Sequence, residues 1–294
     1  MNARLLDAPA LKGVLSEGRQ AYLAVPSRRG PHATPALYGL ANGLIGMWVA
    51  TGTLKARVLG RHGGEGLHTG LLVRTPTAMA VVTGPVQIYD PIRRLAGPSR
   101  HLQAMGVTTS FLARNAADLA GFARDALRGR AGVPPSRRVL LTMAPAGAAV
   151  ISADRIEVLG RLEDGDPPTG PFAAAAEPHV AVLEAASGLV PVPGEWRPDR
   201  GEMEVASNLV DVFGLRSGPS CVIEDDYAAP GPAAKRGRIV FGTAHHAQPA
   251  QPAQPATPDQ GEHPDRKVFR FDVASESAWS GILTRTRDLN DGNS

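Results

Sequence analysis

Ala50-Thr51-Gly52-Thr53-Leu54-Lys55-Ala56-Arg57-Val58-Leu59-Gly60 is the segment around which the chain is organised. It follows an apolar run, residues 44–49, which predicts a buried strand. Thr53 is a favourable N-cap, and Gly60 stands where a helix of about two turns would end. We therefore expect a strand, a tight turn and a short helix.

The side chains at the start of this helix suit an anion. The first N–H groups of a helix have no partner within the helix and attract negative charge. Lys55 and Arg57 add two cations within one turn, and the hydroxyls of Thr51 and Thr53 add further donors. The group predicts a phosphate monoester site. The other interpretation is a solvated helix with ordinary surface charges, because Lys-x-Arg is common in short helices.

The composition favours two β-rich domains. A chain of 294 residues is long for one domain, and a hydrophobic content of 43% lets each half bury a core. Glycine and proline are plentiful, with 33 and 26 residues, which predicts many turns and short strands. The net charge of +3 is small and the arginines are scattered, so we expect no nucleic-acid partner.

The single cysteine and the short apolar runs indicate the cellular compartment of the protein. Cys221 lies in an apolar stretch that predicts a buried strand residue rather than a nucleophile, and one cysteine cannot form a disulfide within the chain. Residues 1–12 lack an apolar signal core, and no run approaches the length of a membrane span. We expect a cytoplasmic protein with no membrane partner.

Strands and turns alternate through the first half. The expected strands are residues 22–25, 32–38, 44–49, 67–73, 77–89, 138–142 and 148–151. Residues 5–17 predict a short amphipathic helix. Apolar residues spaced by three, four or seven predict a long helical segment over 99–130, broken near 106–109. Hairpin turns this short predict a small antiparallel barrel.

The second half repeats the pattern of the first. An offset of 158 residues places Gly30 on Gly188, Pro35 on Pro193, Tyr38 on Trp196 and Gly43 on Gly201. Such a repeat predicts two domains, residues 1–160 and 178–294, joined by a linker over 161–177. Residues 244–265 are rich in Gln-Pro-Ala and predict a low-complexity loop, and the chain after Thr284 is expected to fray.

The second half lacks the anion chemistry. Under the same offset Thr53, Lys55 and Arg57 fall on Asp211, Phe213 and Leu215. The loss of both cations to apolar residues and the added carboxylate of Asp211 disfavour an anion. We therefore expect one phosphate site per chain.

Together these segments resemble the FMN-binding split-barrel family of the pyridoxamine-phosphate-oxidase type. The residues that carry the resemblance are Arg19-Gln20-Ala21-Tyr22-Leu23-Ala24, Gly30-Pro31-His32-Ala33-Thr34-Pro35, Trp48-Val49-Ala50-Thr51, Thr53-Leu54-Lys55-Ala56-Arg57 and Thr83-Gly84-Pro85-Val86-Gln87-Ile88. Their order and spacing match the family over residues 15–90, and residues 137–152 match loosely. The pyridoxal-phosphate-binding pattern of the authentic oxidases is absent, so we do not expect that activity.

The resemblance implies a mainly β fold with helices. It consists of tandem antiparallel six-stranded split barrels that form a pseudo-dimer within one chain, the chain itself being a monomer or a homodimer. By position, Thr51, Thr53, Lys55 and Arg57 would hold the cofactor phosphate, and the backbone around Thr34, Pro35 and Ala50 would border the isoalloxazine ring. The resemblance names no catalytic residue.

The function that the resemblance implies is an FMN-dependent oxidoreductase acting on a small organic molecule. The same fold with a deazaflavin cofactor is one alternative, and a non-catalytic flavin- or haem-binding protein is another. Fold likeness cannot choose among them, because function depends on the site.

Several other residues are candidate ligands for haem or for a cation. His62 and His68 flank a glycine-rich turn and could ligate haem, although exposed loop histidines are the simpler interpretation. The pair His245-His246 is expected in a loop. The cluster Glu224-Asp225-Asp226 could bind a cation, against the simpler interpretation of a solvated turn. No metal site is expected.

Overall fold

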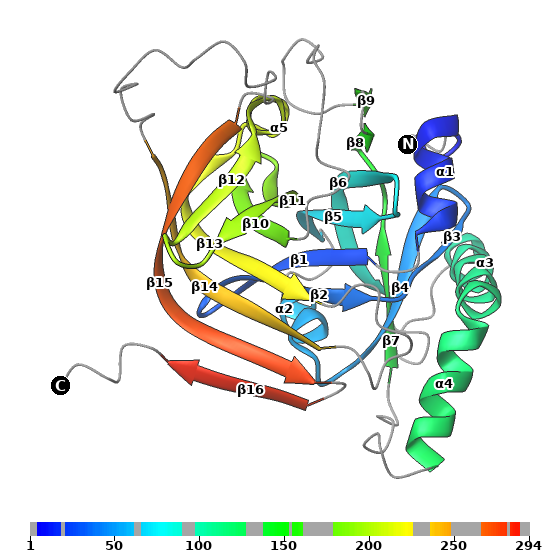
Figure 1. Ribbon diagram of the computed structural model, residues 1–294. Helices are drawn as coiled ribbons and strands as arrows, with labels where there is room; N and C mark the ends of the chain where they lie inside the picture. The colour runs from blue at the N-terminus through cyan, green and yellow to red at the C-terminus, as the bar shows by residue number, and fades with distance from the viewer. Residues whose placement is uncertain are drawn as a thin grey trace.

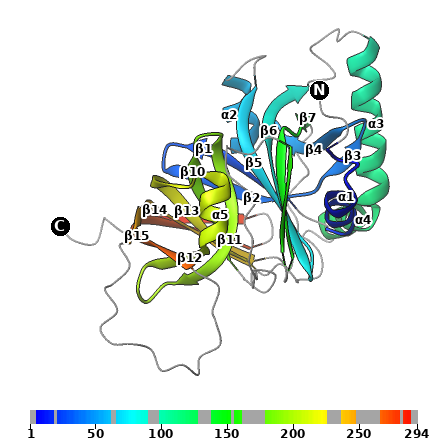
Figure 2. The same cartoon turned by 90° about the horizontal axis from the view of Figure 1, so that it is seen from above.

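The computed structural model describes residues 5–18, 21–61, 66–89, 98–127, 138–152, 155–160, 179–225, 236–247, 266–280 and 283–288. The structure is mainly β, and its strands form two antiparallel barrels that lie side by side (Figures 1 and 2). Helices α1, α3 and α4 lie on the far side of the first barrel from the second. The helices are α1 (Pro9–Glu17), α2 (Leu54–Arg61), α3 (Pro98–Arg114), α4 (Ala116–Leu127) and α5 (Ser207–Phe213).

The first barrel is a ring of six antiparallel strands, two of which are interrupted. Pairing follows the order β2-β1-β5-β6-β7-β4-β3, and β2 leads directly into β3, so these two segments close the ring. β7 and β8 pair with successive parts of β6 and form one bent strand, and β9 adds to β8. The bounds are β1 (Ala21–Ser27), β2 (Gly30–Ala36), β3 (Gly39–Ala41), β4 (Leu44–Ala50), β5 (Leu67–Arg74), β6 (Ala78–Tyr89), β7 (Arg138–Met143), β8 (Gly147–Ser152) and β9 (Ile156–Gly160).

The second barrel closes in the same way. Its strands pair in the ring β10-β11-β12-β15-β14-β13 and back to β10, all antiparallel, with β16 added to β15. The bounds are β10 (His179–Ala185), β11 (Gly188–Arg197), β12 (Glu202–Ala206), β13 (Arg216–Asp225), β14 (Arg236–His246), β15 (Arg266–Ser280) and β16 (Leu283–Asp288). The predicted pair of six-stranded barrels is confirmed.

Two cores lie on opposite sides of a shared wall. In β1, Leu23 packs inside the first barrel, whereas its neighbours Tyr22 and Ala24 pack against the second barrel. Strands β5, β6 and β8 alternate in the same way. Because successive strand residues point to opposite faces, these strands are apolar on both faces. The two barrels therefore fold against one another rather than as separate units.

The internal repeat is exact only at its start. Ala21 pairs with Ala36 in β1–β2, and His179 pairs with Gly194 in β10–β11, which is an offset of 158 on both strands. The next hairpin of the second barrel is two residues shorter. β4 ends at Ala50 and β12 ends at Ala206, an offset of 156. The predicted equivalence of Lys55 with Phe213 is therefore wrong, because the offset changes within the hairpin.

The helix and loop boundaries also differ from expectation. α2 continues through Gly60 to Arg61, and α3 continues through residues 106–109. The break comes at Asn115, whose side-chain amide donates to the carbonyl oxygens of Phe111 and Tyr38. The loop expected over 244–265 cannot begin at 244, because β14 extends to His246. The sequence predicts fraying after Thr284, but β16 continues to Asp288. Residues 161–177, the expected linker, lie outside the described residues.

Glycine allows α3 to lie directly on β3. A Cβ at Gly39 would come within 2.4 Å of the Phe111 backbone nitrogen. We expect Gly39→Ala to lower the free energy of unfolding by about 1–3 kcal/mol, because overpacking forces the helix away. Gly13→Ala is the matched control, since a Cβ there meets nothing within 4 Å, and it should stabilise by about 0.5–1 kcal/mol. Urea denaturation measures both, and equal effects would contradict this packing.

Within the described ranges, no helix combines the length and the apolar character needed to cross a membrane.

Candidate functional site

The turn before α2 is capped as the sequence predicts. The Thr53 hydroxyl donates to the Ala50 carbonyl at 2.8 Å and accepts from the Ala56 N–H at 3.4 Å. Thr51 and Gly52 are exposed, and a Cβ built on Gly52 would meet nothing within 4 Å. The start of α2 therefore presents hydroxyls and helix N–H groups to open space.

Lys55 and Arg57 lie on different sides of α2. The Lys55 side chain is buried, with 5% of the residue exposed, whereas Arg57 is exposed. Residues two apart on a helix do not share a face. The sequence predicts that both cations lie at one point, but only the Lys55 side chain is buried.

Lys55 is buried, His32 is half-buried, and the charge of Lys55 acts on His32. Burial lowers the pKa of the Lys55 ammonium to about 7. Burial, followed by the positive charge of Lys55, lowers the pKa of His32 to about 4. His32 is therefore neutral at neutral pH, and an anion beside the pair would favour protonated Lys55.

The second barrel completes the surroundings of this pair. The His32 ring stacks on Phe241 of β14, with ring centroids 6.1 Å apart and planes 10° apart. A Cβ on Gly30 would lie 3.6 Å from the Ser220 carbonyl oxygen, so β2 runs close over β13. His32 thus lies where β2 meets the second barrel. No sequence pattern indicates a role for Phe241, because only the packing of the barrels brings it to His32.

The residues expected to border a cofactor ring are found at strand ends. Pro35 is half-buried in β2 opposite Tyr22, and Ala50 is half-buried at the end of β4 opposite Arg138. The side chain of Thr34 lies outside the described part of the structure. A role for Thr34, Pro35 and Ala50 at a cofactor remains a prediction.

Two residues of the predicted acidic cluster, Glu224 and Asp225, contact arginines, and Asp226 lies outside the described residues. Glu224 pairs with Arg238 at 2.6 Å. Asp225 accepts a 2.6 Å hydrogen bond from the Tyr22 hydroxyl and lies 3.9 Å from Arg74. Tyr22 and Arg74 belong to the first barrel, so Asp225 joins the two barrels. Among the described residues, no group of three His, Cys, Asp or Glu side chains could hold a metal ion.

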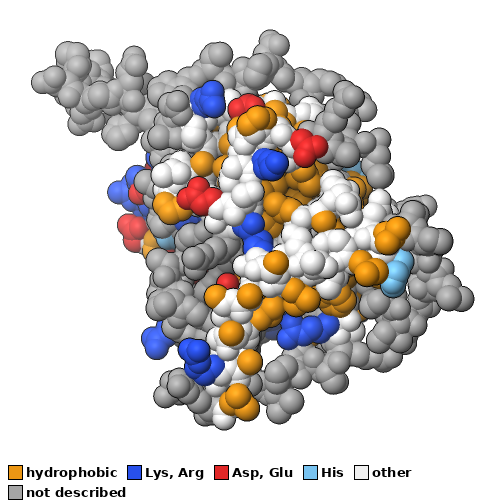
Figure 3. Space-filling view, turned by 90° about the vertical axis from the view of Figure 1, so that its right-hand side faces the viewer, with side chains coloured by type: hydrophobic (Ala, Val, Ile, Leu, Met, Phe, Trp, Pro, Cys, Tyr) orange, Lys and Arg blue, Asp and Glu red, His pale blue; other side chains and the backbone are white. Residues whose placement is uncertain are grey.

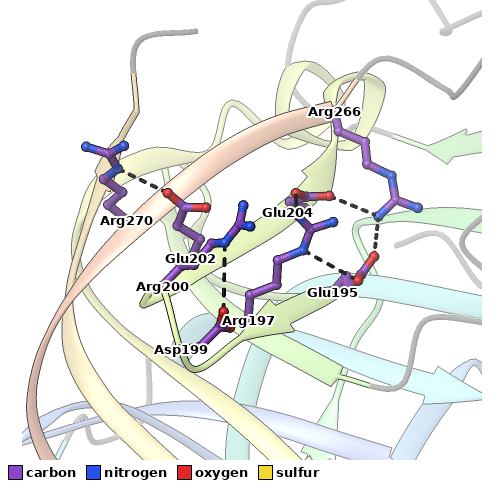
Figure 4. A network of polar contacts seen from close by, with 8 residues as sticks. All are labelled: Glu195, Arg197, Asp199, Arg200, Glu202, Glu204, Arg266 and Arg270. Carbon is purple, nitrogen blue, oxygen red and sulfur yellow. Dashed lines mark hydrogen bonds and ion pairs between the residues drawn. The ribbon is translucent and has the colours of Figure 1, made fainter. Parts of the chain in front are cut away.

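The corresponding region of the second barrel is rich in ion pairs. Figure 4 shows the network on the β11–β12 hairpin and β15, formed by Glu195, Arg197, Asp199, Arg200, Glu202, Glu204, Arg266 and Arg270. On α5 the exposed Asp211 pairs with Lys267 at 2.6 Å. A carboxylate on α5 and arginines already paired with carboxylates make this region a poor anion site.

The structure also describes most of the other candidate residues. Cys221 is buried in β13, as predicted, and burial raises its pKa to about 12. His68 is exposed on β5, and His62 lies outside the described residues. His245 and His246 lie on β14 rather than in a loop, and His245 pairs with Asp272 at 3.0 Å.

No family model matches the chain, and a search of curated proteins found no match. Similar solved structures include a haem-binding protein from Mycobacterium smegmatis, with 12% identity and a TM-score of 0.36. An FAD-binding protein from Mesorhizobium loti has 13% identity and a TM-score of 0.34. A protein of the pyridoxinephosphate oxidase family from Clostridium acetobutylicum has 9% identity and a TM-score of 0.34.

These alignments cover 54%, 49% and 54% of this chain, respectively. They cover 57%, 92% and 95% of the other chains, so the chain spans little more than half of the haem-binding protein. The strand pairing of this chain itself defines the fold.

Proposed function

We propose that this chain binds a phosphate-bearing flavin, FMN, at the start of α2 and acts as an oxidoreductase on a small organic molecule. The phosphate would be held by Lys55, by the hydroxyls of Thr51 and Thr53 and by N–H groups at the start of α2, with Arg57 at the outer edge. Thr34, Pro35 and Ala50 would border the ring. The flavin supplies the electron chemistry, and the protein binds and orients it.

The observation that carries the proposal is the burial of Lys55 at the first turn of a Thr53-capped helix. Burial lowers the pKa of the Lys55 ammonium to about 7, and an anion beside this group would favour its protonated form. The donor set suits a phosphate, because it combines a cation, hydroxyls and helix N–H groups. The open space at Gly52 leaves room for the phosphate outside the turn.

A deazaflavin that carries a phosphate would use the same residues and is the second candidate. Haem binding is the third, and it would depend on a histidine rather than on Lys55. The charge of Lys55 acts on His32, and the stacking of the His32 ring on Phe241 holds it against the second barrel.

The test is a pair of equilibrium titrations with FMN and with riboflavin, which differ by the phosphate. We expect FMN to bind at least tenfold more tightly, because charged hydrogen bonds contribute about 1.5–3 kcal/mol each. Equal affinities would show that the phosphate makes no contact. Failure of both to bind would leave a deazaflavin or haem as the candidates, each tested by the same titration.

Gly52→Val separates binding from folding. Because a side chain at Gly52 meets open space, we expect the free energy of unfolding to change by less than about 0.5 kcal/mol. The new side chain would occupy the space assigned to the phosphate, so FMN affinity should fall about tenfold or more while riboflavin affinity stays nearly constant. Thermal melts and the two titrations measure this, and unchanged FMN binding would place the phosphate elsewhere.

A further inference from the structure

Helices α3 and α4 together form one long rod on the outer face of the first barrel (Figure 1). The helical hydrogen bonds continue through the break, from the Asn115 N–H to Phe111 and from the Leu119 N–H to Asn115, at 3.0 and 2.9 Å. One side of α3 is buried on the barrel through Ala104, Val107 and Phe111.

A second side of the rod is apolar and exposed. Leu102, Met105 and Leu112 on α3 are 65%, 54% and 53% exposed, and Leu127 at the end of α4 is 90% exposed. Figure 3 shows this face of the molecule, with hydrophobic side chains at its surface. Exposed apolar side chains that gather on one face mark an interaction surface.

The spacing of these residues defines a seam along the whole rod. The seam consists of Leu102, Met105, Thr109, Leu112, Ala116, Leu119 and Ala123, which follow one another at alternating intervals of three and four. None of them is charged. Such a spacing is the pattern of a helix that pairs with another helix.

α4 needs such a partner. None of its described side chains is buried, and it contributes no described residue to the hydrophobic cores. A helix of this length is marginal on its own, because helices in proteins gain most of their stability from packing.

We propose that the rod is the interface of a homodimer in which two copies pair antiparallel around a two-fold axis near Arg114. In this register Leu112 faces Ala116 of the partner subunit, and Met105 faces Ala123 of the partner subunit. Each large side chain then meets a small one, which fills the seam evenly. A parallel pair would place alanine on alanine along α4 and leave gaps there.

The size of the seam sets the expected affinity. At 1.5 Å per residue the rod is about 45 Å long, and a seam about 10 Å wide buries about 450 Å² on each copy, or about 900 Å² in total. Specific interfaces begin near about 1,000 Å². We therefore expect a dimer that forms in the micromolar range and dissociates on dilution.

The first test is sedimentation equilibrium of the full chain over a hundredfold range of concentration. We expect dimerisation for the wild type and a loss of at least tenfold in dimer affinity for Leu112→Glu. Ala117→Glu is the matched control, since Ala117 is exposed on α4 but lies off the seam. Circular dichroism checks that both variants fold. A wild type that is monomeric throughout, or a Leu112→Glu dimer as strong as the control, would overturn the proposal.

Cross-linking tests the direction of pairing. Met105→Cys mixed with Ala123→Cys should cross-link between copies with a short bismaleimide, whereas either variant alone should not, because identical positions lie about 27 Å apart along the rod. Cys221 adds little background, since it is buried. Cross-linking of either variant alone, at the yield of the mixture, would show parallel pairing and overturn the register.

Discussion

Lys55→Met is expected to weaken FMN binding by about 10- to 150-fold, because it removes charged hydrogen bonds contributing about 1.5–3 kcal/mol. The same substitution removes an ammonium group that burial disfavours. Binding and stability should therefore change in opposite directions. This combination distinguishes a residue retained for a ligand from one retained for packing, because functional sites keep groups that are unfavourable for folding.

The stability effect has a defined pH dependence. The pKa of Lys55 is lowered from 10.5 to about 7 in the folded chain, so between these values the unfolded chain binds more protons. Stability contributed by this group therefore rises with pH from about 7 to 10.5. The advantage of Lys55→Met over the wild type should be largest below pH 7 and should shrink as the pH rises. Chemical denaturation at several pH values measures it.

Arg57→Met is the matched control for both measurements. Because Arg57 is exposed, we expect its loss to weaken FMN binding by less than about fivefold, with no pH-dependent change in stability. If Arg57→Met weakens FMN binding as much as Lys55→Met does, Lys55 is not the main ligand of the phosphate. If the stability of Lys55→Met parallels that of the wild type at every pH, the ammonium is not buried.

The second large effect is expected at the junction of the barrels. Asp225→Ala should lower the free energy of unfolding by about 3–5 kcal/mol, because removing one partner of a buried ion pair is strongly destabilising. The substitution also removes the acceptor of the Tyr22 hydroxyl. The Asp225 side chain is 6% exposed and that of Arg74 is 11% exposed. Urea denaturation followed by tryptophan fluorescence measures the loss.

Two control variants separate the contributions to this loss of stability. Tyr22→Phe removes the 2.6 Å hydrogen bond to Asp225 and should cost about 1.5–3 kcal/mol. Asp272→Ala removes an exposed carboxylate beside His245 and should cost less than about 1 kcal/mol. An Asp225→Ala variant no less stable than Asp272→Ala would mean that the carboxylate does not hold the barrels together.

The barrels were predictable from sequence because their signals are local. Turn residues such as Asn42-Gly43, which both adopt positive φ, set the hairpins, and strand alternation set the faces. The cap of α2 by Thr53 was equally local. The shorter second hairpin was not predictable, because the offset of 158 keeps Gly201 in its turn and hides the loss of two residues.

The site was only partly predictable. The identity of Lys55 as a candidate came from its place in α2, but its burial depends on the barrel beneath it. Its neighbours depend on the contact between barrels, which brings Phe241 to His32 from a distant part of the chain. The same limit applies to Asp225, whose partners Tyr22 and Arg74 lie in the other barrel.

The most direct test of a flavin at the start of α2 is the visible absorbance spectrum of the purified protein, followed by identification of the small molecule that heat releases. We predict a flavin spectrum and the release of FMN. A haem spectrum, or a colourless protein that takes up no added FMN, would contradict the assignment of Lys55 to a flavin phosphate.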